Sequence, residues 1–175
     1  MKRILVLLVL MIGCGKPFKV ETAPGFVELE NQETWEYQYR ATSPEGVVFA
    51  VKTIDIDEAK SDLDFWTKAV TLQLRDVQGY ALLDVKDVTS LDGTKGKSLR
   101  FGHDEDGKPF DYWLTLYVAR AAWPAQSRLF LVEAGGAKAH FERFQPSVEW
   151  MEKSVKVKCG GFLAPVFSSN TCNRW

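Results

Sequence analysis

Hydrophobic and polar residues alternate with a period of two in the first part of the chain. Val27 and Leu29 alternate with glutamates, and the segments Trp35–Ala41 and Val47–Val51 continue the pattern. A period of two predicts strands with one buried face. Ser43-Pro44-Glu45-Gly46 separates the last two strands and has the Pro and Gly placement of a tight turn.

The period becomes helical between residues 61 and 79. The apolar positions recur at helical spacing: Leu63, Trp66, Val70, Leu74 and Val77. Ser61 can cap the start and Gly79 can end the segment. This predicts a helix of about 16 residues whose apolar stripe lies on a sheet.

Four further strand-like runs follow, separated by turns rich in Asp, Gly and Pro. They cover roughly residues 81–88, 97–103, 110–119 and 128–134. Short turns predict antiparallel neighbours. The continuously apolar segment Leu129–Val132 predicts a central strand that is covered on both faces.

The end of the chain returns to a helical pattern after Gly135-Gly136, which we interpret as a connecting turn. Residues Ala137 to Val155 keep one apolar face, but Pro146 lies inside the pattern and predicts a break or kink near Gln145, and we expect two short helices sharing that face. The whole order predicts an α+β fold, an antiparallel sheet of about six to seven strands sandwiched by helices.

This order, βββαββββα, resembles the Mog1/PsbP-like fold over roughly residues 25–158. The resemblance includes the ending that runs from Arg128-Leu129-Phe130-Leu131-Val132-Glu133-Ala134 through Phe144 to Trp150-Met151-Glu152-Lys153-Ser154-Val155. It implies an adaptor or assembly factor that binds other proteins, often without catalysis. It implies no functional residues, because no family motif aligns with named positions.

The first residues form a secretion signal. Lys2 and Arg3 precede an apolar run from Ile4 to Ile12, which is too short to span a bilayer as a helix. The segment from Leu10 to Cys14 resembles the lipobox of bacterial lipoproteins, which implies cleavage after Gly13 and acylation of Cys14. An ordinary signal peptide in which Cys14 is incidental is the alternative.

This gives a domain organisation: residues 1–13 as a cleaved signal peptide, 14–25 as a lipidated tether, 26–158 as a single α+β domain and 159–175 as a C-terminal flap. Several acyl chains would hold the mature protein stably on a membrane of the cell envelope. Resemblance to enteric lipoproteins implies the outer membrane, because Gly15 and not Asp follows the cysteine.

The remaining cysteines fit an oxidising compartment. With Cys14 acylated, Cys159 and Cys172 are the only two thiols, and we expect them to form a disulfide that closes the flap, with two free thiols as the alternative. Lys and Arg number 22 against 23 Asp and Glu, so the chain lacks the basic character of a nucleic-acid-binding protein.

The sequence offers no catalytic constellation. The two histidines are His103, followed by Asp104-Glu105-Asp106, and His140. We interpret the acidic run as a solvated hairpin tip, since EF-hand spacing is absent, and we find no Gly-x-Ser-x-Gly nucleophile motif. We therefore predict a protein that is not an enzyme and that holds no cofactor or metal.

The leading hypothesis is a membrane-anchored envelope lipoprotein that acts as a non-catalytic binding subunit or assembly factor for another envelope protein. It predicts an exposed apolar patch or an unpaired sheet edge. Trp123, in a loop beside Pro124, is the candidate partner-binding residue, with a loop side chain folded back on the core as the alternative. The alternative is a carrier that encloses a hydrophobic small ligand or lipid between sheet and helices. An envelope hydrolase is the third hypothesis.

Overall fold

The computed structural model describes residues 16–30, 36–57, 62–120 and 127–157. Within them lie seven strands, two α-helices and one π-helical turn. In chain order these are β1 (Val27–Glu28), β2 (Tyr39–Thr42), β3 (Val48–Ile56), α1 (Leu63–Leu72), η2 (Gln73–Val77), β4 (Ala81–Thr89), β5 (Lys95–Glu105), β6 (Lys108–Ala119), β7 (Ser127–Ala137) and α2 (Lys138–Ser154). The predicted α+β class and its order of strands and helices are confirmed.

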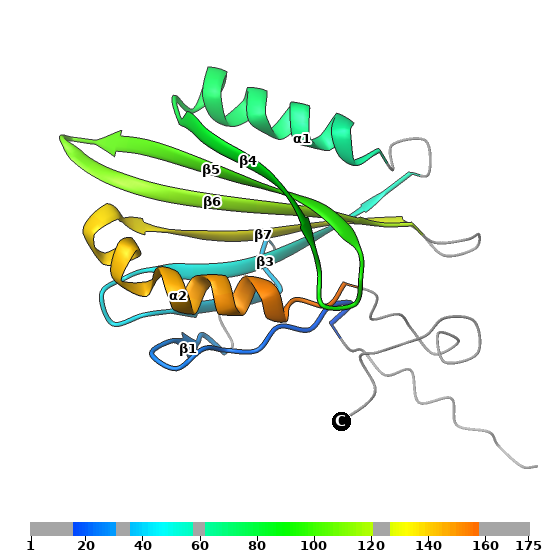
Figure 1. Cartoon of the computed structure of the whole chain (residues 1–175), viewed down its shortest axis with the longest axis horizontal. Coiled ribbons are helices and arrows are strands. Elements are labelled where there is room, and N and C mark those ends of the chain that lie inside the picture. The colour runs from blue at the N-terminus through cyan, green and yellow to red at the C-terminus, as the bar shows by residue number, and fades with distance from the viewer. Residues whose placement is uncertain (1–15, 31–35, 58–61, 121–126, 158–175) are drawn as a thin grey trace, which may run out of the picture.

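The strands form one sheet in the order β1-β2-β3-β7-β6-β5-β4, and every neighbouring pair is antiparallel. β7 lies in the middle, between β3 and β6 (Figure 1). Its residues Leu129 and Phe130 are buried on opposite sides, the first in the core beside α1 and the second in the core beside α2. The central position predicted from the apolar run is therefore confirmed.

The two helices cover opposite faces of this sheet (Figure 1). Under α2, the β1–β3 side of the sheet and the central strands contribute a core that contains Phe49, Val51, Phe130, Phe141 and Met151. Under α1 and η2, the central strands and β5 contribute a second core that contains Leu74, Leu99, Phe101, Leu114 and Leu129. Alternation along each strand divides its residues between these two cores.

α2 is one continuous helix through Pro146, so the prediction of two short helices is wrong. Phe141, Val148 and Met151 lie before and after the proline and are all buried, so both halves of the helix pack on the sheet. Pro146 itself is exposed. The loss of one helical hydrogen bond at an exposed position is compatible with an unbroken helix when packing is strong.

α1 has its N-cap one residue later than predicted and continues into a π-helical turn before the predicted stop. Its N-cap is Asp62, whose carboxylate accepts a hydrogen bond from the Asp64 N–H at 3.0 Å, whereas Ser61 lies outside the described residues. The helical pattern continues after Leu72 as the wider turn η2, and Gly79 follows with φ of 75°. That left-handed conformation suits glycine, so the predicted stop is at the right residue.

Residues 16–25, predicted to be a tether, pack on the domain. Phe18 and Ala23 are buried in the core under α2. Lys19 and Lys156 exchange two backbone hydrogen bonds of 2.9 and 2.8 Å. The start of the described chain and its last residues therefore lie together at one end of the sheet, and any tether must be shorter than predicted.

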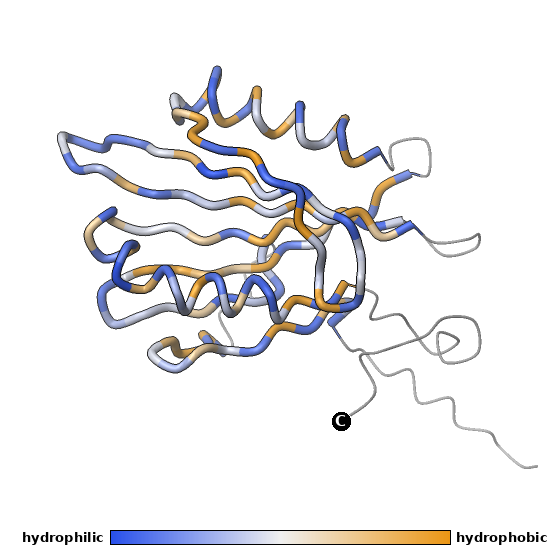
Figure 2. The backbone as a smooth tube through the Cα atoms, in the orientation of Figure 1, coloured by the Kyte–Doolittle hydropathy of each residue, from blue (hydrophilic) through white to orange (hydrophobic). Residues whose placement is uncertain are grey.

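The opposite end of the sheet carries the β5–β6 hairpin, whose tip is hydrophilic (Figure 2). The backbone N–H of Gly107 donates to the Asp104 carboxylate at 2.8 Å, which closes this turn.

In the part of the chain that the structure describes, no helix is long and apolar enough to cross a membrane.

Candidate functional site

A pocket of about 350 Å³ opens on the face of the sheet that carries α1. It lies over β2, β3, β7 and β6, at the end of the sheet away from Lys19. Its floor is made of small residues, including Ala50 and Gly135, and its walls include Tyr37, Arg40, Val48, Phe110, Tyr112 and Glu133. This volume is at the lower end of the range for small-ligand pockets.

Glu133 is the fixed anion of this pocket. It projects from the central strand β7, and its Oε2 accepts hydrogen bonds of 2.9 Å from the hydroxyls of Tyr37 and Tyr112. Among the described residues, none donates to Oε1. The carboxylate is thus held in one orientation by two neutral donors while one oxygen keeps its hydrogen-bonding capacity.

Burial, followed by the negative charge of Glu133, raises the pKa of both Tyr37 and Tyr112 above the ordinary value for tyrosine. Both phenols are therefore protonated at neutral pH and act as hydrogen-bond donors. A tyrosine in this state does not serve as a base at neutral pH.

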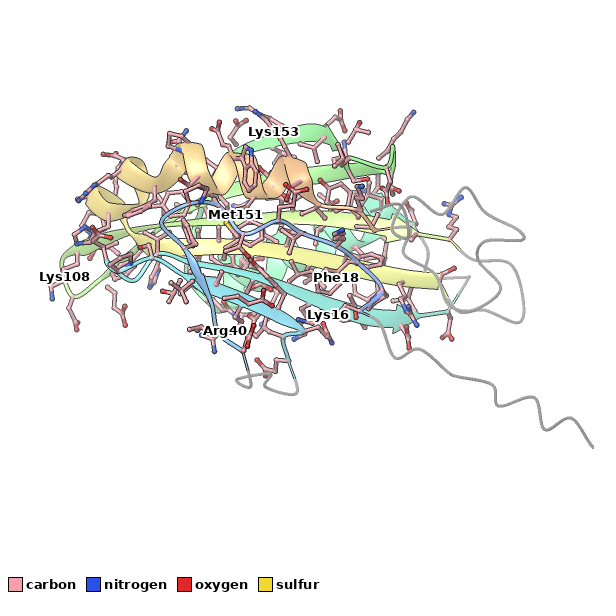
Figure 3. All side chains as sticks on the ribbon, turned by 90° about the horizontal axis from the view of Figure 1, so that it is seen from below. Lys16, Phe18, Arg40, Lys108, Met151 and Lys153 are labelled. Atoms are coloured by element: carbon pink, nitrogen blue, oxygen red, sulfur yellow. The ribbon has the colours of Figure 1, made fainter. Side chains whose placement is uncertain are left out.

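Arg40 supplies a cation on the other side of the pocket floor. Arg40 pairs with Ala50, and Ala50 pairs with Glu133, so the three residues form one row across β2, β3 and β7 and point to one face. Figure 3 shows Arg40 on the side of the sheet away from α2. In the described part of the chain no ion pair joins Arg40 to Glu133, and the small Ala50 side chain leaves the space between them open.

Two local features of this pocket differ from the sequence predictions. Tyr37 precedes β2 and bonds to Glu133 on the α1 face, whereas Tyr39 is buried on the α2 face, so the two do not share the face that alternation predicts. Gly135 and Gly136 belong to β7 and do not form a connecting turn. A Cβ at Gly135 would lie 3.3 Å from the Tyr112 ring, so the absence of a side chain lets that ring lie over the strand.

A second polar cluster lies between α2 and the sheet. Glu152 Oε2 accepts a hydrogen bond of 3.0 Å from Arg100 Nη2, and Glu152 Oε1 is within hydrogen-bonding distance of the hydroxyls of Ser98 and Thr115. The Arg100 guanidinium also stacks at 3.5 Å from the centre of the Trp113 ring. Because both Glu152 oxygens are bonded to groups of the sheet, we interpret the cluster as a link that fixes α2 on the sheet, although Arg100 Nη1 is buried without a hydrogen-bond partner among the described residues.

Exposed apolar side chains occur near β4 on both faces of the sheet. Val85 pairs with Leu99 and lies on the α1 face, whereas Leu83, beside Gly102, lies on the other face. Leu83 and Val85 of β4 are 63% and 43% exposed, and Phe65 and Leu72 of α1 are 51% and 56% exposed. β4 is the last strand of the sheet, and no described strand pairs with its outer edge. We name these four residues together with that edge the β4 surface.

β4 also carries features that limit uncontrolled pairing. The register shifts between Leu82 and Asp84, and Lys86 forms an ion pair of 2.9 Å with Asp84. Bulges and charged side chains are common protections of edge strands. The regular part of β4 begins after this shift and runs from Asp84 to Thr89.

The structure brings few of the residues singled out from the sequence into a site. Gly13, Cys14, Trp123, Cys159 and Cys172 lie outside the described residues, so lipidation, the Trp123 contact and the disulfide receive no support from the structure and stay predictions. His103 stacks on Tyr80 with a ring separation of 4.5 Å, and His140 is exposed. The described residues contain no group of three side chains arranged to hold a metal ion.

Sequence reasoning missed the Glu133 pocket. One signal was present, because Glu133 is the only charged residue in the run from Leu129 to Ala134. A carboxylate in a central strand must find donors or water. What the sequence does not show is that its donors come from Tyr37 and Tyr112, which lie 96 and 21 residues away along the chain.

Comparison with known proteins finds similarity in fold and none in sequence family. No protein-family model and no curated protein sequence matches the chain. The structure is similar to that of LpqN, a protein involved in cell envelope biogenesis of Mycobacterium tuberculosis, with a TM-score of 0.60, 10% sequence identity and coverage of 79% of this chain and 82% of that chain. It is also similar to PA94, a protein of unknown function from Pseudomonas aeruginosa, with a TM-score of 0.44, 11% identity and coverage of 78% and 81%.

Proposed function

We propose that this chain is a lipid-anchored protein of the bacterial cell envelope that binds another envelope protein as a non-catalytic subunit or assembly factor. The observation that carries the proposal is the β4 surface, where an open strand edge and exposed apolar side chains occur together. The similarity in fold to LpqN is compatible with an envelope role.

The partner that this surface favours is a protein with an extended apolar segment. An edge strand offers unpaired backbone groups that an added strand can satisfy, and neighbouring apolar side chains can receive every second residue of that strand. Phe65 and Leu72 add exposed apolar surface on α1. Because Lys86 and Asp84 protect one part of β4, only a segment with matching register can pair.

Placement relative to the membrane supports the same role. If the lipid is on Cys14, only Gly15 separates it from Lys16, the first described residue, and two residues of chain reach about 7 Å. The end of the sheet that holds Lys19 and Lys156 would then face the bilayer. The Glu133 pocket, at the other end, would face the aqueous compartment.

The proposal is tested by site-specific photocrosslinking in cells that express the full chain. A crosslinker at Leu83 should capture one defined envelope protein, and a crosslinker at the exposed Lys153 on α2 should not. Val85→Lys should abolish the Leu83 adduct, and Cys14→Ala should remove the acyl mass. Equal capture from both positions, or an adduct that Val85→Lys does not change, would contradict the use of the β4 surface; a mature protein without acyl groups would contradict the anchor.

A small-ligand function is the second candidate, and the Glu133 pocket is the observation that favours it. The layers between sheet and helices are packed with side chains of the two cores. A ligand would therefore bind in this open pocket on the surface of the sheet, not between the layers as the carrier hypothesis predicts.

A further inference from the structure

The Glu133 pocket contains an anion and a cation that do not neutralise each other. Glu133 lies on β7 and Arg40 on β2, with β3 between them. Their backbones are therefore about 10 Å apart, twice the spacing of neighbouring strands. In a half-buried setting, two opposite charges separated by an open floor favour a ligand that carries the complementary pair.

The Glu133 side of the pocket is suited to an ammonium group. Two tyrosine hydroxyls occupy Oε2, so a ligand donor would meet Oε1, and a charged donor makes a stronger hydrogen bond there than a neutral one. The aromatic rings of Tyr112 and Phe110 line the same pocket. Aromatic faces attract ammonium cations, which adds to the attraction of the carboxylate.

The Arg40 side is suited to an acidic group. A guanidinium binds carboxylates and phosphates through paired hydrogen bonds, and Arg40 has no carboxylate partner within the described residues. Its neighbour on β3 is Ala50, whose small side chain does not fill the pocket. An acid placed beside Arg40 would thus sit in the same cavity as an ammonium group beside Glu133.

We infer that the Glu133 pocket binds a small zwitterion, with its ammonium group on Glu133 and its acidic group on Arg40. A free amino acid and a phosphoethanolamine head group both present this pair of charges on a short chain. The inference goes beyond the proposed adaptor role and is independent of it. The pocket involves β2, β3, β7 and β6, whereas the β4 surface lies at the other edge of the sheet.

The test is calorimetric titration of the purified full-length protein. The probes are glycine, 4-aminobutyrate, 6-aminohexanoate and phosphoethanolamine, with propylamine and propionate as molecules that carry one charge only. We expect at least one zwitterion to bind about tenfold or more tightly than either control, since each charged hydrogen bond contributes to affinity. Preference for an aminocarboxylate would indicate an amino acid, and preference for phosphoethanolamine would indicate the head group.

Two variants remove one charge each and keep a similar shape. Glu133→Gln should weaken binding of the best zwitterion by roughly tenfold to a hundredfold and leave propionate unchanged, and Arg40→Gln should do the same while leaving propylamine unchanged. Asp76→Asn and Arg75→Gln, at exposed positions of η2, are the matched controls and should have no effect.

A third variant tests the space between the charges. Ala50→Val narrows the floor and should weaken the zwitterion although both charges remain. Thermal unfolding of each variant shows that it is folded at the temperature of the titration. The inference is overturned if no zwitterion binds better than the controls that carry one charge, or if folded Glu133→Gln and Arg40→Gln bind the zwitterion as the wild type does.

Discussion

The two helices of this protein cover the same sheet in different ways. α2 buries Phe141, Val148 and Met151 completely and adds the charged link from Glu152 to Arg100. α1 has no fully buried residue, and Phe65 and Leu72 are more than half exposed. The difference indicates that α2 is a structural element of the fold, whereas α1 keeps apolar surface that a partner can cover.

The largest loss of stability should come from truncating a buried side chain in the core under α2. Phe141 is fully buried and meets the Trp113 ring with centroids 4.9 Å apart. Phe141→Ala should lower the free energy of unfolding by about 4 kcal/mol, and Phe65→Ala in α1 by less than about 1 kcal/mol, in urea denaturation. If both variants lose a similar free energy of unfolding, the two helices contribute equally to stability, and the difference between them described above is wrong.

The charged link under α2 should come next. The Arg100 and Glu152 side chains are only 17% and 13% exposed, so Glu152→Ala leaves a buried cation without its carboxylate. We expect a loss of about 3 kcal/mol. The matched control is Asp55→Ala, which breaks the more exposed pair with Arg128 and should cost less than about 1 kcal/mol. A small loss for Glu152→Ala would mean that the link does not fix α2.

Replacing the proline of α2 should have the opposite sign. Pro146→Ala restores a helical hydrogen bond and a good helix former at an exposed position, and we expect a gain of about 2 kcal/mol. The greater freedom of alanine in the unfolded chain reduces this gain. Urea denaturation measures it. A loss of stability would show that Pro146 has a packing role that its exposure does not reveal.

The smallest effect concerns the tyrosines of the pocket. The pKa of Tyr112 is raised in the folded state, so its contribution is complete below the unfolded value of about 10 and is lost as pH rises above it. Tyr112→Phe should cost about 1.5 kcal/mol at neutral pH and should flatten the decline of the free energy of unfolding above about pH 10. Because the pKa of Tyr37 is also raised, the free energy of unfolding of the variant should still decline in part above that pH. If the free energy of unfolding of the wild type and of Tyr112→Phe changes with pH in parallel, the pKa of Tyr112 is not raised in the folded state.

Much of the fold could be predicted because its signals are local. Alternation located the strands, Gly79 located the end of the α1–η2 segment, and the apolar run Leu129–Val132 placed β7 in the centre. Pro146 misled the prediction, because the local cost of a proline was outweighed by burial on both sides of it. The prediction of a tether over residues 16–25 was also misleading. Phe18 and Ala23 are buried in the core, although no hydrophobic period in the sequence indicates it.

The pocket could not be predicted, because it depends on register and not on pattern. Arg40, Ala50 and Glu133 become one row only after β2, β3 and β7 have paired. Tyr37 does not lie on the face that alternation assigns to it, and its hydroxyl bonds to Glu133 instead. A motif search fails here because the residues are spread over most of the domain.

The pairing of Lys19 with Lys156 has a mechanical consequence. A force that pulls on the amino end would meet the exposed Lys16–Glu28 ion pair and the buried Phe18 before it reaches the two backbone hydrogen bonds of this pair. Once Phe18 and Ala23 leave the core, residues 16–25 would extend by up to about 35 Å while the seven-stranded sheet stays intact. We expect single-molecule pulling from the amino end to show one short, low-force step before the main unfolding event.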